Sequence, residues 1–307
     1  MILTVCMSPC VDVTIELDSL NVGRVNIVRS KTMSYSGKAI NVAIGLKHLG
    51  GDVYSTGFMY RENGEIFERA LQEEGIPFAF VWNEGRVREN YKLIDKKSML
   101  TEINDVGSPI KEGNLEVLLA KIRELSAGAE VTVISGGLPR GVDPGYYGEA
   151  LRRVDPKSIK IVDAEGGKLA SALDAEVDLV KPNLEELQEL LGREFCSKAD
   201  MLVGCRELID RGAKSVLLSL GKEGAVITDG YRSYYSKTNN VAVNSTVGAG
   251  DAMVAAVALK MKERADMPEI LRAGVAAGTA SVTTFEATTF TKDKYEEIYH
   301  NLSVMEI

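Results

Sequence analysis

The sequence is poor in the residues that build histidine-rich metal sites, zinc clusters and disulfide scaffolds. Its 307 residues include two histidines, His48 and His300, and four cysteines without any Cys-x-x-Cys spacing. A histidine-rich metal site is therefore excluded, and neither a zinc cluster nor a disulfide framework is indicated. This cysteine usage predicts four reduced thiols in a cytoplasmic protein.

Two further absences concern partners and location. Lys and Arg number 36 against 44 Asp and Glu, a formal net charge of −8, so the surface lacks the basic excess that nucleic-acid binding needs. No apolar run approaches the roughly 18 residues of a membrane helix, and no basic, apolar leader follows Met1. We therefore expect a cytoplasmic protein without a nucleic-acid or membrane partner.

Short apolar runs alternate with segments of helical period through the middle of the chain. The apolar runs are Val131–Ile134, Ile159–Val162, Asp178–Val180 and Val216–Leu218, and the helical segments are Leu115–Leu125, Tyr146–Val154, Leu184–Leu191 and Met201–Arg211. This alternation predicts an α/β fold with a parallel sheet between layers of helices. Because such sheets bind ligands at the carboxyl ends of their strands, the residues that follow each run are candidates for the site.

Two regions have a period of two residues instead. Val11–Leu17 and Val25–Arg29 read as extended segments, and Tyr91–Ile94 and Met99–Ile103 flank a short turn, which is typical of a hairpin. These segments predict a small, half-exposed sheet. The pattern alone leaves open whether that sheet is a lid beside the main sheet or an extension of its edge.

A glycine-containing loop precedes a helical segment late in the chain. Gly248 and Gly250 allow a tight turn, and Asp251–Lys260 is rich in Ala, Val and Leu, which predicts a buried helix. The free N–H groups at the start of that helix would form an anion site. Asp251 fits either a capping carboxylate or a catalyst, and the residues alone do not decide between them. The loop is no dinucleotide fingerprint, since Met253 replaces the third glycine.

A second helix start lies near the beginning of the chain. Gly37 and Lys38 open a segment with an apolar helical face that ends at Gly50-Gly51. A helix start with a cation beside it suits a phosphate or a polyol. A solvated surface side chain is the alternative role for Lys38.

Several short motifs occur in one order along almost the whole chain. They are Ser8–Asp12, Ser36–Val42, Arg88–Asn90 followed by Thr101–Ile103, Ser135–Gly141, Lys181–Leu187, Ser219–Ala225 and Asn244–Asp251. Together they resemble the phosphofructokinase-B group of the ribokinase-like sugar kinases, and within it the 1-phosphofructokinase and tagatose-6-phosphate kinase branch. Each motif is a weak signal by itself, whereas their order is specific.

The resemblance implies an architecture. We expect an α/β, ribokinase-like three-layer sandwich with a mainly parallel central sheet plus a small β-sheet lid. Residues 1–307 would form a single kinase domain, with lid strands inserted at about 11–34 and 89–105. Members of the branch often pair through such lids, so a homodimer is expected as well.

The resemblance also implies roles for individual residues, in three groups. Asp251 would be the general base, and Gly248, Ala249 and Gly250 would offer N–H groups to the transferring phosphoryl. The sugar phosphate would be bound by Asp12, Gly37, Asn41 and Ser135, with Lys38 and Arg88 on its phosphate. The nucleotide would be bound by Lys181, Asn183, Ser219, Gly221 and Gly224, and Mg²⁺ by Glu186 and Asn183 through water.

The activity implied is the ATP- and Mg²⁺-dependent phosphorylation of a ketohexose phosphate, with fructose 1-phosphate giving fructose 1,6-bisphosphate as the preferred reaction. Tagatose-6-phosphate kinase, or fructose-6-phosphate kinase, is the alternative on the same machinery. Ser36, Ala39 and Gly137 depart from the family pattern beside the expected sugar site. These departures motivate an alternative of a different class, a sugar-phosphate sensor without turnover, against which the intact Asp251 loop counts.

Overall fold

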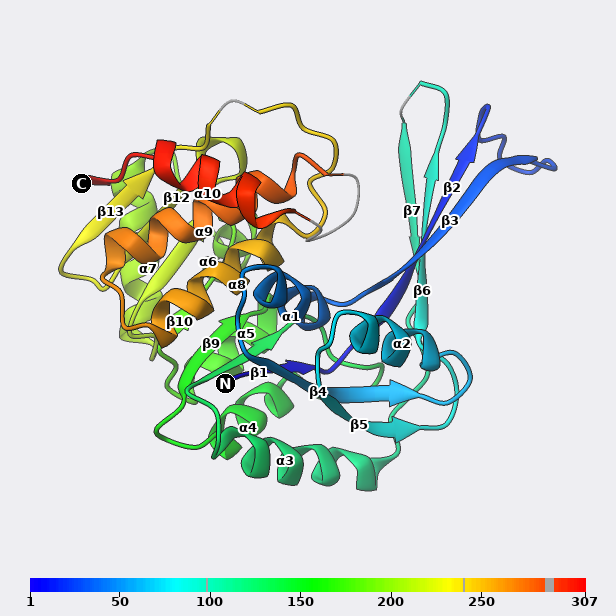
Figure 1. Ribbon diagram of the computed structural model, residues 1–307, viewed down its shortest axis with the longest axis horizontal. Coiled ribbons are helices and arrows are strands. Elements are labelled where there is room, and N and C mark those ends of the chain that lie inside the picture. Colours follow the sequence, from blue (N-terminus) through cyan, green and yellow to red (C-terminus); the bar gives the residue numbers. More distant parts are fainter. Residues whose placement is uncertain (98, 240, 285–289) are drawn as a thin grey trace.

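The computed structural model describes residues 1–97, 99–239, 241–284 and 290–307, and a ten-stranded sheet forms its centre (Figure 1). In spatial order the strands are β14 (Met305–Glu306), β13 (Ser233–Ser236), β12 (Ala225–Thr228), β11 (Val216–Ser219), β10 (Leu179–Val180), β9 (Ile159–Asp163), β8 (Val131–Ser135), β1 (Ile2–Cys6), β4 (Val53–Tyr60) and β5 (Phe78–Asn83). The pairs from β11 to β5 are parallel, and the pairs from β11 to β14 are antiparallel. The mainly parallel sheet predicted from the apolar runs is confirmed.

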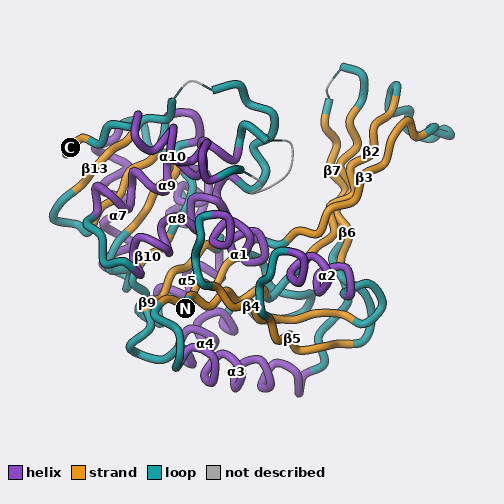
Figure 2. Tube along the Cα trace, in the orientation of Figure 1, coloured by secondary structure: helices purple, strands orange, loops and turns teal. Residues whose placement is uncertain are grey.

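Helices cover both faces of this sheet (Figure 2). One layer contains α1 (Lys38–His48), α2 (Glu65–Glu73), α8 (Ala249–Lys262), α9 (Met267–Ser281) and α10 (Lys292–Asn301). The other contains α3 (Glu112–Ser126), α4 (Gly145–Arg153), α5 (Gly166–Leu173), α6 (Leu184–Leu191) and α7 (Lys198–Asp210). Successive strand residues serve opposite layers, as Ile2 and Leu3 do, which is why the buried strands are apolar throughout. The three-layer α/β fold is therefore confirmed.

A second sheet of four strands projects from the body (Figure 1). Its order is β3 (Val28–Ser36), β2 (Cys10–Leu17), β6 (Arg88–Ile94) and β7 (Leu100–Asn104). Because it is a separate sheet, the edge-extension alternative is wrong. The expected segment Val25–Arg29 was also misplaced, since the strand begins at Val28 and runs on to Ser36. Serines, threonines and lysines dominate that strand, so apolar alternation could not mark it.

The two faces of this second sheet differ in character. Asp12 lies opposite Ser34 on one side and Asn90 on the other, and Asn104 continues this polar row. The next row, one residue along, places Val13 beside Met33 and Tyr91. Successive residues of a strand point to opposite faces, so one face of the sheet is polar and the other largely apolar. The polar face is the one that reaches the candidate site.

The helices expected from sequence form close to their predicted bounds, and α6 matches the expected Leu184–Leu191. In the described part of the chain, no helix has both the length and the apolar character needed to cross a membrane. A cytoplasmic location stays a prediction.

Candidate active site

A cavity of about 540 Å³ opens where the carboxyl ends of the parallel strands meet the polar face of the second sheet. Twelve of the predicted site residues line it, namely Asp12, Gly37, Lys38, Asn41, Arg88, Lys181, Asn183, Glu186, Ser219, Gly248, Gly250 and Asp251. These residues come from strands, helix starts and loops that are far apart in the sequence. The fold therefore gathers most of the expected site into one space.

A second cavity of about 470 Å³ adjoins the first. Gly221, Gly224 and Ala249 line this cavity, and Asn183, Ser219 and Gly250 line both. Its wall also carries apolar side chains, Val241, Val243, Met253, Val275 and Val282. A mostly apolar slot joined to a polar cavity suits a ligand with a flat ring and an anionic tail. The predicted sugar residues other than Ser135 thus line the first cavity, whereas the predicted nucleotide residues are spread over both, with Lys181 in the first alone.

Asp251 lies at the border of these spaces, in the first turn of α8. The helix begins after Gly248, whose φ of 80° is left-handed and favours glycine there. Asp251 is an acidic residue of the first turn, where the helix dipole favours a carboxylate, but its side chain does not hydrogen-bond to the start of α8. Instead its Oδ2 accepts a hydrogen bond of 2.7 Å from Nδ2 of Asn41. The side chain reaches out of its helix toward the first cavity.

The environment of Asp251 makes it a better proton acceptor than an ordinary aspartate. The residue is 6 % exposed. Burial, reinforced by the negative charge of Asp163, raises the pKa of Asp251 to about 6, against the opposing effects of Asn41, Lys38 and Lys181. A carboxylate with such a pKa is still ionised at neutral pH, and it can accept a proton during a reaction.

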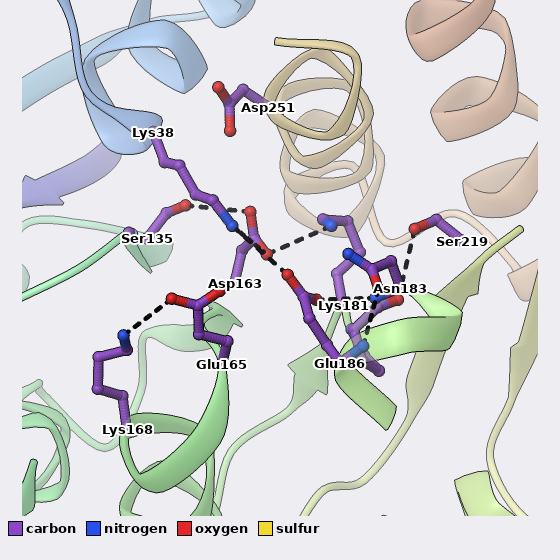
Figure 3. A network of polar contacts seen from close by, with 12 residues as sticks. Lys38, Ser135, Asp163, Glu165, Lys168, Lys181, Asn183, Glu186, Ser219 and Asp251 are labelled. Atoms are coloured by element: carbon purple, nitrogen blue, oxygen red, sulfur yellow. Dashed lines mark hydrogen bonds and ion pairs between the residues drawn. The ribbon is translucent and has the colours of Figure 1, made fainter. Parts of the chain in front are cut away.

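Asp163 is a residue of this site that the sequence reasoning did not assign. It ends β9, is 1 % exposed, and its Oδ1 lies 3.3 Å from Nζ of Lys181 and 3.4 Å from Nζ of Lys38 (Figure 3). Burial opposes ionisation, but the two ammonium groups outweigh it and hold the pKa of Asp163 below its ordinary value. Its position directly after a buried strand was the available signal.

Ser135 has a different place from the one expected. It was predicted to bind substrate, yet it is buried and lines neither cavity. Its Oγ donates to Oδ2 of Asp163 at 3.3 Å. The side chain at the end of β8 therefore supports a neighbouring carboxylate, because the adjacent parallel strand places Asp163 beside it.

The two cations expected on the substrate's phosphate differ in their surroundings. Besides Asp163, Lys38 has a second acidic neighbour, since its Nζ lies 3.9 Å from Oε1 of Glu186. Burial opposes the charge of Lys38, but Asp163, Asp251 and Glu186 outweigh it and raise the pKa of Lys38. The solvated-surface alternative for Lys38 is disfavoured. Arg88 instead donates from Nε to Oγ of Ser8 at 3.2 Å and from a terminal nitrogen to Asn90 at 2.9 Å. Both partners of Arg88 are neutral, so neither compensates its charge.

Asp12 lies on the polar face of the second sheet and is held by that sheet. Nζ of Lys92 is 3.0 Å from its Oδ2, and Nδ2 of Asn90 donates to its Oδ1 at 3.3 Å. Lys92, Asn90, Glu102 and Asn104 all line the first cavity and were not assigned from sequence. The spacing Arg88, Asn90, Lys92 could have identified Asn90 and Lys92, because alternate residues of a strand share one face.

Asn183 and Glu186 form a reciprocal capping box at the start of α6. Oδ1 of Asn183 accepts from the Glu186 amide at 2.9 Å, and Oε2 of Glu186 accepts from the Asn183 amide at 2.8 Å. Oε1 of Glu186 remains directed toward the cavity and Lys38. Among the described residues no three His, Cys, Asp or Glu side chains converge as metal ligands. The side-chain oxygens of Asn183 and Glu186 fit Mg²⁺, because this ion keeps several waters and needs few protein oxygens.

Comparison with known proteins gives consistent results. Residues 5–294 match the pattern of the pfkB family carbohydrate kinases. The chain is 31 % identical to a 1-phosphofructokinase of Vibrio cholerae over 92 % of its length and 89 % of the relative. It is 29 % identical to a tagatose-6-phosphate kinase of Staphylococcus epidermidis over the full length of both. The crystal structure of phosphofructokinase-2 from Escherichia coli in complex with potassium superposes with a TM-score of 0.90, at 29 % identity, over 98 % of each chain.

Proposed function

The chain belongs to the pfkB family of carbohydrate kinases, and we propose that it transfers the γ-phosphoryl group of ATP to fructose 1-phosphate, giving fructose 1,6-bisphosphate. The observation that carries this proposal is the position of Asp251, a buried carboxylate with a raised pKa that lines the polar cavity next to Gly250, which also lines the adjoining, largely apolar cavity. The polar cavity would hold the sugar phosphate and the other the nucleotide. Their border would then be the place of transfer.

In the proposed reaction Asp251 accepts the proton of the acceptor hydroxyl. The hydroxyl oxygen bonds to the γ-phosphorus, the bond from that phosphorus to the β–γ bridging oxygen breaks, and ADP leaves. Asn41 orients the carboxylate through its 2.7 Å hydrogen bond. The N–H groups of Gly248, Ala249 and Gly250 would stabilise charge on the transferring group, since α8 begins there. Phosphoryl transfer needs chiefly this alignment and charge stabilisation.

In the proposed complex, different cations of the first cavity would bind the substrate's own phosphate and the transferring phosphoryl group. Arg88 is the proposed anchor for the phosphate that the substrate already carries, because the two side chains to which it donates are neutral and its planar guanidinium suits a phosphate. Lys38 and Lys181 lie against Asp163 and would face the transferring phosphoryl group. Glu186 and Asn183 would hold a hydrated Mg²⁺, which would supply further charge neutralisation to the nucleotide phosphates.

Tagatose 6-phosphate and fructose 6-phosphate remain the alternative substrates, because the same polar cavity would accept any ketohexose phosphate. Purified protein should be assayed for ADP release with fructose 1-phosphate, fructose 6-phosphate and tagatose 6-phosphate. We expect the highest kcat/KM with fructose 1-phosphate. Activity confined to unphosphorylated sugars would contradict the proposal and leave Arg88 without its role.

The relatives are kinases and the Asp251 loop is intact, so a sensor without turnover is disfavoured. Measurable ADP release that depends on the sugar phosphate would exclude that alternative. Binding of the sugar phosphate with no ADP release would support it.

We also propose that the second sheet acts as a lid and pairs with that of a second copy. Large apolar residues are exposed on its strands, as Met33 and Ile103 are, and on the loop between β2 and β3, as Val22, Val25 and Ile27 are. Such a patch and the two edge strands β3 and β7 would be protected by pairing. A tetrameric form is known for the related phosphofructokinase-2 of Escherichia coli.

Light scattering on purified protein should give the mass of a dimer, and Ile27→Asp should shift it toward the monomer. Val117→Asp is the matched control, because Val117 is also exposed but lies on α3, away from the second sheet. A monomeric mass for the unmodified protein would contradict this part of the proposal.

A further inference from the structure

The charged groups around Asp163 come from three separate parts of the fold. Lys38 is the first residue of α1, Lys181 follows β10, and Asp163 ends β9 between them. Figure 3 shows both lysine side chains converging on the Asp163 carboxylate, with Ser135 beside it and Asp251 on the helix above. Asp163 is thus the common partner of two cations of the cavity.

We propose that Asp163 is a positioning residue that clamps the ammonium groups of Lys38 and Lys181 beside Asp251 at the place of phosphoryl transfer. The inference rests on the proposed kinase reaction and assigns a role to a residue that the motifs left unassigned. Asp163 lines the first cavity at its floor but acts through the two lysines.

The first argument concerns conformational freedom. A lysine ammonium ends a chain of four flexible methylenes, so its position is set by whatever it binds. Lys181 is 4 % exposed, and a buried ammonium without a partner is strongly disfavoured. Asp163 supplies that partner, and its own second oxygen is fixed by Ser135. Without the charged carboxylate, both ammonium groups would stay in the cavity but lose their fixed position, and Lys38 would keep Glu186 at 3.9 Å as its partner.

The second argument concerns electrostatics at Asp251. The charged groups that face Asp251 are Asp163 on β9, Lys38 on α1 and Lys181 after β10, while Asn41 on α1 donates a hydrogen bond. Asp163 raises the pKa of Asp251, and both lysines lower it. Removing the negative charge of Asp163 while the lysines stay would therefore lower the pKa of Asp251. The clamp thus also affects how strongly Asp251 attracts a proton.

The main test is Asp163→Asn, which keeps the shape of the side chain and removes its charge. We expect kcat to fall at least about tenfold, because the ammonium groups are no longer held in one position. We expect the acid limb of kcat/KM to move to lower pH, because the lysines remain in the cavity while the negative charge of Asp163 is lost. KM for the sugar phosphate should change little, since Asp12 and Arg88 do not contact Asp163. An acid limb and a kcat equal to those of the unmodified protein would overturn the inference.

Two variants separate charge from position. Asp163→Glu keeps the charge but displaces it by one methylene, so we expect a lowered kcat with an acid limb close to the original. Glu165→Gln is the control, because Glu165 lines the same cavity but pairs with Lys168. It should move the acid limb much less than Asp163→Asn does. An equal movement in both variants would show a general effect of cavity charge and would contradict the clamp.

A measurement without turnover distinguishes a failure of this inference from a failure of the proposed function. The pKa of Asp251 can be followed by carboxyl ¹³C NMR, with its signal assigned by Asp251→Asn. If the protein shows no kinase activity but Asp163→Asn still lowers the pKa of Asp251, only the proposed function fails. If the pKa does not move, the inference fails whatever the activity. Should Asp163→Asn not fold, Ser135→Ala loosens the same carboxylate, and an unchanged kcat in that variant would count against the clamp.

Discussion

Replacing Asp251 by Asn should make the enzyme inactive and the fold more stable at the same time. The substitution removes the proton acceptor but leaves an amide oxygen that can still accept the hydrogen bond from Asn41. We expect kcat to fall by roughly two to four orders of magnitude, the usual contribution of a general base. Affinity for the sugar phosphate should change little, because the cavity keeps its other contacts.

The gain in stability follows from the raised pKa. The carboxyl has its ordinary value of 3.8 in the unfolded chain and about 6 in the folded protein, so ionising it favours unfolding. A difference of about two pH units corresponds to about 3 kcal/mol. The penalty is absent below about pH 4, grows between about pH 4 and 6, and is complete above. Asp251→Asn should recover it and raise Tm by about 5 °C at pH 8.

Thermal unfolding of the unmodified protein and of Asp251→Asn, at pH values from 4 to 8, would measure this effect. Asp163→Asn is an informative contrast, because the pKa of Asp163 is lowered in the folded state. Its charge stabilises the fold above the unfolded pKa of 3.8, and that stabilisation is lost as the pH falls through the lower folded value. Asp163→Asn should therefore destabilise the protein at pH 8. A pH-independent Tm difference for Asp251→Asn would refute the reasoning.

The remaining predictions concern the walls of the two cavities. Gly224→Ala should destabilise the protein by more than about 2 kcal/mol in denaturant unfolding, because a Cβ there would lie 1.9 Å from the Ser236 carbonyl oxygen and φ is +94°. Gly250→Ala should raise stability slightly, because alanine favours helices. It should also lower kcat, because the new Cβ would lie 3.4 Å from Nζ of Lys181, the ammonium proposed to face the transferring phosphoryl group. An unchanged kcat would contradict this. Lys92→Met should raise KM for the sugar phosphate severalfold with little effect on KM for ATP, and steady-state kinetics on both substrates would show whether the two effects separate.

Much of the fold could be predicted because its signals are local. The apolar run Val131–Ile134 and the amphipathic Leu184–Leu191 each carry their own periodicity, and the structure places a strand and a helix there. The strand Val28–Ser36 was displaced in the prediction because most of it is polar and exposed. Its pairing with β2 determines its extent, and a single segment does not encode a pairing.

The motifs of the candidate site could be predicted from the sequence, but the contacts between its side chains could not. The motifs supplied Asp251 and Arg88, since glycine loops and charged residues stand out in a sequence. Ser135 was taken for a substrate residue, whereas the structure turns it toward Asp163. Which side chain faces a cavity depends on the neighbouring strand, which lies far away in the sequence.

The sequence by itself determined the class of fold, the family and the helix starts that could hold anions, because these depend on residue type and local spacing. Only the tertiary structure decided that the Asp251 carboxylate accepts a hydrogen bond from Asn41, and that Asp163 joins two lysines. The physical reason is that burial and charge pairing arise between distant segments. Those two effects, and not the motif, set the pKa of the carboxylate on which the proposed reaction depends.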